Sequence, residues 1–481
     1  MFLFLACIFW PLLWTLFPFM LMAIYLRVSY HFKDGKTFSF LHPACASGGG
    51  GEGVLWTAIA ALQKCDKFKQ KFSKIVIYAD KNSPVLSPSE MVERVHKQFG
   101  ISVESDNLSI VPLSMVKWAL RPESIPFLTL LAQAFFSMLL ALEAIWKHAP
   151  DVVIDTTGLT FGLPVFHWFL GKNCRIGAYV HYPWISTNMI SVVAGRQASF
   201  NNRSIYAKSA FLSNLKILYY RILAFCYAYA GSCAEKVMVN SKWTEDHVVE
   251  IWNRYSKENL SVVYPPVNVK AFLDHQVRKD KKGTKTAVFV AQFRPEKNHK
   301  FLIESFAIFL SSVYRSDFVL KLIGSCRSCD DQMRLQELKD LCKQLDIADN
   351  VQFCVGIPHD ELVDSLCRAN VAVHPMVDEH FGIAVVEAMA AGLIVIAHDS
   401  GGPSRDILLP PDYNPRQPTG ILVSRGCLDK DAFAAALKTA FVEMSEDEIE
   451  KMTRAARHVS QERFSAEKFA EGFLQSVSPL L

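Results

Sequence analysis

Two glutamates eight positions apart are the residues of this chain best suited to chemistry. Glu379 and Glu387 flank a loop at Gly382, and a β-branched run over residues 371–374 precedes them and stops at Pro375. This pattern predicts a buried strand, a loop and then an Ala-rich helix. A helix N-terminus at a strand's carboxyl end can bind phosphate, and carboxylates accept hydrogen bonds from sugar hydroxyls. A sugar nucleotide would suit such a site, although an ordinary connection with solvated glutamates gives the same pattern.

Residues 378–392 read Asp-Glu-His-Phe-Gly-Ile-Ala-Val-Val-Glu-Ala-Met-Ala-Ala-Gly and resemble the E-x7-E signature of retaining GT-B glycosyltransferases of family 4. The resemblance implies the α/β GT-B fold, in which two Rossmann-like domains face a cleft. It also implies that Glu379 lies near the donor sugar and that Glu387 binds the nucleotide ribose. By the same resemblance, the backbone that contacts the diphosphate and sugar is that of Phe381, Gly382 and Ile383.

Cationic residues follow another predicted strand, residues 286–290. Without a metal cofactor, a diphosphate leaving group needs cations to take up charge as the glycosidic bond breaks. The family resemblance assigns this role to Lys297. Where the family usually has an arginine this chain has Gln292, so Arg294 becomes the offset candidate for donor binding. Surface cations around a helix start are the alternative interpretation.

A glycine-rich segment lies in the first half of the chain. Residues 37–42 predict a strand, residues 43–53 a glycine-rich loop, and the residues from Val54 onward a helix. Such a loop can cradle the phosphate of an acceptor or donor, or serve only as a flexible turn. It lacks the G-x-G-x-x-G pattern with its acidic partner, which argues against dinucleotide binding. The candidate loop residues are Gly49, Gly50, Gly51 and Glu52.

A predicted strand over residues 176–180 ends at His181. A histidine at a strand end can hydrogen-bond a substrate hydroxyl or stabilise developing charge, although a lone histidine is usually structural. By resemblance to family 4, His181 contacts the donor sugar and joins Glu379 and Lys297 as a catalytic residue.

Three stretches, residues 48–56, 178–186 and 237–244, are similar to a mannosyltransferase branch of family 4. This resemblance implies a retaining α-1,2-mannosyltransferase that uses GDP-mannose and a dolichyl-diphosphate oligosaccharide in N-glycan precursor assembly. It implies no cofactor and a metal-independent reaction, and no Asp-x-Asp pair lies in a suitable loop. Other mannosyltransferases of the same pathway are candidate partners.

Several uncharged runs predict contact with a membrane. Residues 1–26 carry no charged side chain and exceed the ~30 Å hydrocarbon core at about 1.5 Å per residue. Basic residues follow from Arg27, so we expect the rest of the chain on the cytosolic side of the membrane. The family resemblance implies that this membrane is the endoplasmic reticulum. Residues 125–142 favour an interfacial helix, with a core helix and a second span as alternatives. The cationic and aromatic stretch 188–233 suits lipid headgroups or an ordinary amphipathic helix.

The bulk composition fits this picture. The chain has 481 residues and 51% hydrophobic content, enough for two or three domains and suggestive of a membrane contact. A net charge of +4, with no long basic run, argues against nucleic-acid binding. The 12 cysteines form no repeating framework, so reduced thiols are expected.

The predicted organisation has four parts. An anchor over residues 1–30 precedes an acceptor domain over 37–270 and a nucleotide-sugar domain over 284–460, and residues 461–481 return towards the first domain. The rival hypotheses are a non-catalytic GT-B membrane scaffold for other glycosyltransferases, a family 4 enzyme with another nucleotide sugar, and a nicotinamide-dependent oxidoreductase.

Overall fold

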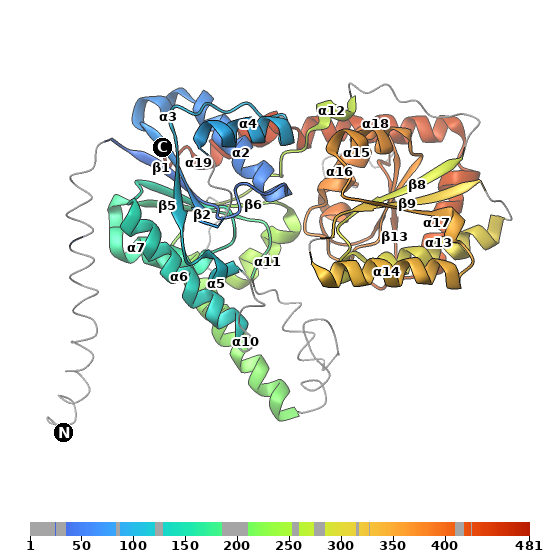
Figure 1. Cartoon of the computed structure of the whole chain (residues 1–481), viewed down its shortest axis with the longest axis horizontal. Coiled ribbons are helices and arrows are strands. Elements are labelled where there is room, and N and C mark those ends of the chain that lie inside the picture. Colours follow the sequence, from blue (N-terminus) through green and yellow to red (C-terminus); the bar gives the residue numbers. More distant parts are fainter. Residues whose placement is uncertain are drawn as a thin grey trace. The chain divides into compact units, whose positions relative to one another are not determined.

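The computed structural model describes residues 25, 35–82, 87–120, 128–184, 210–252, 259–273, 284–313, 317–326, 328–408, 418–424 and 426–481. The predicted anchor, apart from Tyr25, lies outside the described residues, as does the stretch 185–209. The chain divides into two compact units (Figure 1). Unit 1 comprises Met1–Asn240, Thr244–Val263 and Ala470–Leu481, and unit 2 comprises Ser241–Trp243 and Tyr264–Phe469.

Unit 1 is built on a seven-stranded sheet in the order β3-β2-β1-β4-β5-β6-β7, with parallel pairing throughout. Its strands are β1 Thr37–Leu41, β2 Lys74–Asp80, β3 Leu108–Leu113, β4 Val152–Asp155, β5 Arg175–Val180, β6 Lys236–Val239 and β7 Leu260–Val262. Its helices are α2 Gly50–Lys64, α3 Asp66–Lys71, α4 Pro88–Phe99, α5 Val116–Leu120, α6 Thr129–Lys147, α7 Leu163–Leu170, α10 Ala210–Gly231, most of α11 Lys242–Trp252 and most of α19 Ala466–Val477.

Unit 2 is built on a six-stranded sheet in the order β10-β9-β8-β11-β12-β13, also parallel. Its strands are β8 Lys285–Val290, β9 Phe318–Gly324, β10 Val351–Val355, β11 Val371–His374, β12 Ile394–His398 and β13 Ile421–Val423. Its helices are α12 Val269–Leu273, α13 His299–Val313, α14 Cys329–Gln344, α15 His359–Arg368, α16 Ile383–Ala391, α17 Lys430–Lys438 and α18 Glu446–Phe464.

The central strands are apolar because helices cover both faces of each sheet. All residues of β1, β11 and β12 are buried, as expected for strands of a parallel sheet. These strands alternate with helices, so each unit is Rossmann-like, and the predicted fold class is confirmed.

The strand orders fix where ligands can bind. In unit 2 the order reverses between the neighbouring strands β8 and β11, and in unit 1 it reverses between β1 and β4. Loops that leave two such strands diverge, which opens a crevice at the carboxyl ends. Lys297 follows β8 and Glu379 follows β11, whereas the glycine-rich segment follows β1 and His181 follows β5.

Candidate active site

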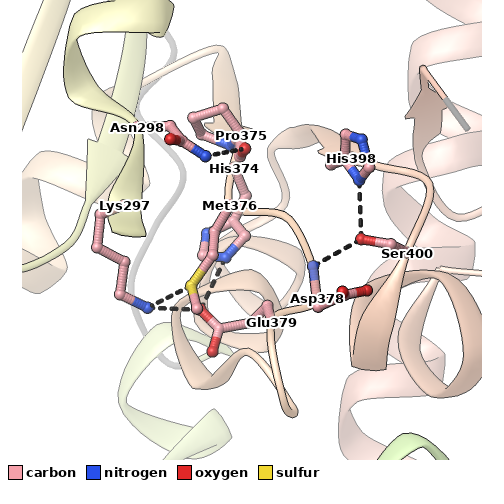
Figure 2. Close-up of polar contacts among 9 residues, drawn as sticks. All are labelled: Lys297, Asn298, His374, Pro375, Met376, Asp378, Glu379, His398 and Ser400. Carbon is pink, nitrogen blue, oxygen red and sulfur yellow. Dashed lines mark hydrogen bonds and ion pairs between the residues drawn. The ribbon is translucent and has the colours of Figure 1, made fainter. Parts of the chain in front are cut away.

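Lys297, Glu379 and His374 meet at the switch point of unit 2 (Figure 2). The Lys297 Nζ donates to Glu379 Oε2 at 2.6 Å and lies 3.0 Å from the Met376 Sδ. The same carboxylate oxygen is 3.0 Å from His374 Nε2. Lys297 is 82 positions from Glu379 in the sequence, and adjacent parallel strands bring the two together.

The electrostatics of this cluster keep Glu379 ionised. Burial by itself would raise the pKa of Glu379, but the hydrogen bond with His374 and the positive charge of Lys297 outweigh it and hold the pKa well below its usual range. A buried carboxylate paired in this way fixes the ammonium group in place. The cation is therefore positioned before any ligand arrives.

The loop between β11 and α16 is held by the glycines of a second loop. The Gly402 N–H donates to Glu379 O at 2.7 Å, and the Asp378 N–H donates to Ser400 Oγ at 2.8 Å. A Cβ on Gly401 would stand 2.2 Å from Glu379 O, and one on Gly402 would stand 2.4 Å from the carbonyl oxygen of the buried Phe381. The loop 400–403 thus packs against the loop that carries Glu379.

The start of α16 offers free backbone donors. Gly382, at φ 111°, is the N-cap, a conformation that favours glycine. Val385 and Val386 donate to Gly382 O, so among the described residues the N–H groups of Ile383 and Ala384 have no backbone acceptor. These donors and the helix dipole can hold an anionic group.

Glu387 lies one turn into α16 and is half-buried. Burial raises its pKa to about 7. No hydrogen-bond partner of its carboxyl group is found among the described residues, so the group is available to a ligand's hydroxyls.

The Lys297 N–H donates to the Arg294 backbone oxygen at 3.2 Å, but the Arg294 side chain takes no part in the hydrogen bonds that join Lys297, Glu379 and His374. Arg294 is exposed and lines a cavity of about 570 Å³ together with α14 residues such as Arg334 and Glu337. Neither Lys297 nor Glu379 lines that cavity. The role of Arg294 as the offset family arginine stays a prediction.

In unit 1 the last four residues of the glycine-rich segment, 50–53, are helical, because α2 begins at Gly50. The expectation of a loop up to residue 53 was therefore wrong for Gly50, Gly51, Glu52 and Gly53. The Glu52 carboxylate accepts from the Gly49 N–H at 2.8 Å, and this cap stabilises the first turn in spite of its glycines. The segment presents a helix N-terminus to the carboxyl edge of the sheet.

Two histidines flank this helix start. His42 Nδ1 is 2.8 Å from Thr156 Oγ1, and His42 Nε2 is 3.8 Å from Glu52 Oε1. His181 Nε2 is 3.2 Å from the backbone oxygen of Thr156. A Cβ on Gly51 would lie within 4 Å of both imidazole rings. Thr156, at the end of β4, thus links both histidines.

The acids around these histidines are perturbed in opposite directions. Burial would raise the pKa of Glu52, but the interaction with His42 and backbone N–H groups holds it below the usual value. Burial raises the pKa of Asp155 to about 6, although Asp155 accepts from the Thr157 and Gly158 N–H groups. Glu52 therefore stays ionised to lower pH than Asp155 does.

His374 and His42 were missed by the sequence reasoning. His374 is the last residue of β11 and His42 directly follows β1, and each precedes a proline. A position at the end of a predicted strand is also what identified His181, which is followed by Tyr182-Pro183. Among the described residues no group of three His, Cys, Asp or Glu side chains could hold a metal ion.

Most of this chain is similar in sequence to known proteins. Residues 35–252 match the family model described as ALG11 mannosyltransferase N-terminus, and residues 272–459 match that of glycosyl transferases group 1. Relatives named GDP-Man:Man(3)GlcNAc(2)-PP-Dol alpha-1,2-mannosyltransferase include those of Mus musculus, with 37% identity over 93% of this chain and 88% of the relative, and of Homo sapiens, with 38% identity over 93% and 88%. The Dictyostelium discoideum relative is 36% identical over 95% of this chain and 87% of its own length.

Solved structures agree on the fold. A glycosyltransferase from Rickettsia africae has a TM-score of 0.60 at 16% identity, covering 93% of this chain and 99% of that one. The trehalose-6-phosphate synthase OtsA has a TM-score of 0.65 at 12% identity, covering 93% and 100%. At such identities the likeness shows the fold alone. The identity to the curated relatives shows more: the chain belongs to the GDP-Man:Man(3)GlcNAc(2)-PP-Dol alpha-1,2-mannosyltransferase family of glycosyltransferases.

Proposed function

We propose that this chain transfers mannose from GDP-mannose to Man(3)GlcNAc(2)-PP-dolichol in α-1,2 linkage, with retention, during assembly of the N-glycan precursor. The name shared by its relatives supports the substrates. The observation that carries the chemistry is the Lys297–Glu379 ion pair beside the free N-terminus of α16.

Each part of this cluster has a role in the proposed reaction. The diphosphate of GDP-mannose lies against the N-terminus of α16, where the Ile383 and Ala384 N–H groups and Lys297 take up negative charge. Glu379 accepts hydrogen bonds from mannose hydroxyls and also fixes Lys297. Glu387 binds the ribose hydroxyls.

The reaction breaks the bond between the anomeric carbon and the phosphate oxygen and forms one to the acceptor oxygen. The acceptor attacks the face that the leaving group vacates, so the configuration is retained, and the acceptor proton passes to the departing phosphate. His181 contacts the donor mannose, and the start of α2 with Glu52 receives the acceptor or its phosphate. Lys297 supplies the charge neutralisation that a metal would otherwise give, so we expect no metal requirement.

We place the enzyme at the endoplasmic reticulum membrane with its catalytic units in the cytosol. The support is the uncharged stretch at residues 1–26 and the basic residues that follow it. A lipid-linked acceptor also requires access to a membrane.

The test is transfer by the purified full chain. GDP-mannose, UDP-glucose and UDP-GlcNAc are each incubated with a phytanyl-linked Man(3)GlcNAc(2) diphosphate in the presence of EDTA. Mannosylated product with GDP-mannose alone is expected. Transfer from UDP-glucose, or a strict need for a divalent cation, would overturn the donor or the metal-free part of the proposal. In cells, normal glycan elongation by a Glu379→Ala, Lys297→Ala variant would favour a scaffold.

A further inference from the structure

Two side chains at the carboxyl end of β12 hold the loop that carries Glu379. His398 is the last residue of β12, and Ser400 follows it by two positions. His398 Nδ1 and Ser400 Oγ lie 2.8 Å apart, and the Asp378 N–H donates to the same Ser400 Oγ at 2.8 Å. Figure 2 shows the two contacts meeting at the Ser400 hydroxyl. We call these two contacts the loop brace.

The hydrogen bonds of the loop brace run from the backbone to the imidazole. A serine hydroxyl donates one proton and can accept at its oxygen. The Ser400 oxygen accepts from the Asp378 N–H, so the hydroxyl proton can go to His398 Nδ1. Burial lowers the pKa of His398 and outweighs the charges of Asp378 and Asp399, so the imidazole is neutral near pH 7 and has one accepting nitrogen.

The loop brace ends on a backbone in an uncommon conformation. Asp378 has φ 52°, in the left-handed region that residues other than glycine rarely adopt. Such a conformation persists where the surrounding structure imposes it. Ser400 holds the Asp378 N–H, and the Gly402 N–H donates to Glu379 O at 2.7 Å. The loop after β12 therefore holds the Asp378–Glu379 dipeptide at both ends.

The Glu379 side chain needs accurate placement because one of its oxygens makes two contacts. Oε2 lies 2.6 Å from Lys297 Nζ and 3.0 Å from His374 Nε2. These contacts hold the carboxylate, whereas the loop after β12 holds the backbone from which the side chain extends. A displacement of about 1 Å at an active site can lower the rate by about 10². Loosening this backbone would disturb the carboxylate and the cation together.

Packing alone does not account for a histidine at the end of β12. His398 is 1% exposed, and burying its polar ring costs free energy that burying an apolar side chain of similar size would not. Buried polar groups are normally retained together with a hydrogen-bond partner. The partner of Nδ1 is Ser400, and the Ser400 oxygen in turn holds Asp378.

We propose that His398 and Ser400 are positioning residues for mannosyl transfer, which hold the Asp378 N–H and thereby direct Glu379 towards Lys297 and the donor sugar. Within the described residues, no hydrogen bond joins either side chain to the Glu379 carboxylate, so both act through the backbone. The effect on the reaction rests on the proposed function, whereas the effect on the loop does not.

Pairs of variants of similar shape provide the experiment. Ser400→Thr keeps the hydroxyl, and Ser400→Val has the same shape without it. The amide of His398→Asn can replace Nδ1, and His398→Leu lacks a polar group. Ser404→Val, in the segment that follows, is the matched control, because the Ser404 hydroxyl donates to Asp399 Oδ1 at 2.5 Å and the Asp378 N–H is held by Ser400.

Amide hydrogen exchange, followed by mass spectrometry on the purified full chain, measures the loop brace without requiring activity. The peptide that contains Asp378 should exchange about fivefold faster in Ser400→Val, the change expected for one lost hydrogen bond, and faster to a smaller extent in His398→Leu. Ser400→Thr, His398→Asn and Ser404→Val should exchange as the wild type does. Wild-type exchange in Ser400→Val would overturn the proposal.

Initial rates of transfer from GDP-mannose measure the consequence for the reaction. Ser400→Val should lower kcat by about 10 to 10², and Ser400→Thr should restore it. In a Glu379→Gln background Ser400→Val should have little further effect, because Ser400 acts through Glu379. An equal loss in both backgrounds would show a general loosening of the fold and would overturn the proposal, as would wild-type kcat in Ser400→Val.

The two measurements separate this proposal from the proposed function. Faster exchange at Asp378 in Ser400→Val, in a chain whose wild type transfers no mannose, would support the loop brace and refute the proposed function. Wild-type exchange in Ser400→Val, in a chain that transfers mannose, would refute the loop brace and leave the proposed function intact.

Discussion

Replacing Lys297 by methionine removes the cation beside Glu379 and keeps a side chain of similar length. The ammonium is held 2.6 Å from Glu379 Oε2, so it is positioned before the donor binds. Removing one preorganised donor from a developing negative charge lowers kcat by about 10²–10³, or about 3–4 kcal/mol. We therefore expect Lys297→Met to lower kcat for mannosyl transfer by at least about 10².

The assay is the initial rate of transfer from GDP-mannose to the phytanyl-linked acceptor over a range of donor concentrations. Charge on the leaving diphosphate develops in the transition state, so kcat should fall more than KM rises. Lys300→Met, at an exposed lysine three positions further on, is the matched control and should retain wild-type rates. A kcat for Lys297→Met within about threefold of wild type would refute the reasoning, since that is far below the loss expected for such a donor.

Stability must be separated from catalysis in this variant. Lys297→Met leaves the buried Glu379 carboxylate with His374 as its partner, and breaking a buried pair costs about 3–5 kcal/mol. Adding Glu379→Gln removes the uncompensated charge, so the double variant should regain melting temperature without regaining kcat. Recovery of both by the double variant would show that the single variant lost activity through misfolding.

The remaining predictions concern the surroundings of the two switch points. Gly402→Ala should lower both the melting temperature and kcat, because its Cβ would stand 2.4 Å from a backbone oxygen, whereas Gly472→Ala has room and should be tolerated in thermal scans. The folded-state pKa of Glu387, about 7, exceeds the ordinary value near 4.3, so the folded protein loses unfolding free energy as pH rises between about 4.3 and 7. Glu387→Gln should thus raise the melting temperature more at pH 8 than at pH 4.5; an equal change at both would contradict the shift. The amide of His42→Asn can replace Nδ1 in the contact with Thr156, and the amide of His42→Gln can replace Nε2 in the contact with Glu52. The variant that keeps the more important contact should retain the higher rate of mannosyl transfer. Wild-type rates in both variants would show that His42 does not contribute to the site.

The sequence predicted the parts of the fold that local patterns determine. The run at 371–374 followed by an Ala-rich segment became β11 and α16, and the strand at 286–290 became β8, because burial on both faces demands continuous apolar residues. The start of α2 was misplaced, since glycines normally disfavour a helix and the cap from Glu52 to Gly49 reverses that local preference.

Contacts across the sheet were beyond local patterns. Nothing near Lys297 in the sequence indicates that its charge meets Glu379, because the pairing depends on β8 and β11 being neighbours in the sheet. The same holds for Thr156, which joins His42 and His181 from three different strand ends. The exposure of apolar side chains on α6 and α10 also depends on tertiary packing, because an apolar helix has the same sequence pattern whether it is buried or exposed.

The most direct test of the account is the chemical identity of the bond that the purified chain makes. The product formed from GDP-mannose and phytanyl-linked Man(3)GlcNAc(2) diphosphate is analysed by methylation and by proton NMR of its anomeric signals. We expect a 2-substituted mannose carrying a new α-linked mannose. A β anomer, another linkage position, or an untouched acceptor in the presence of GDP-mannose would contradict it.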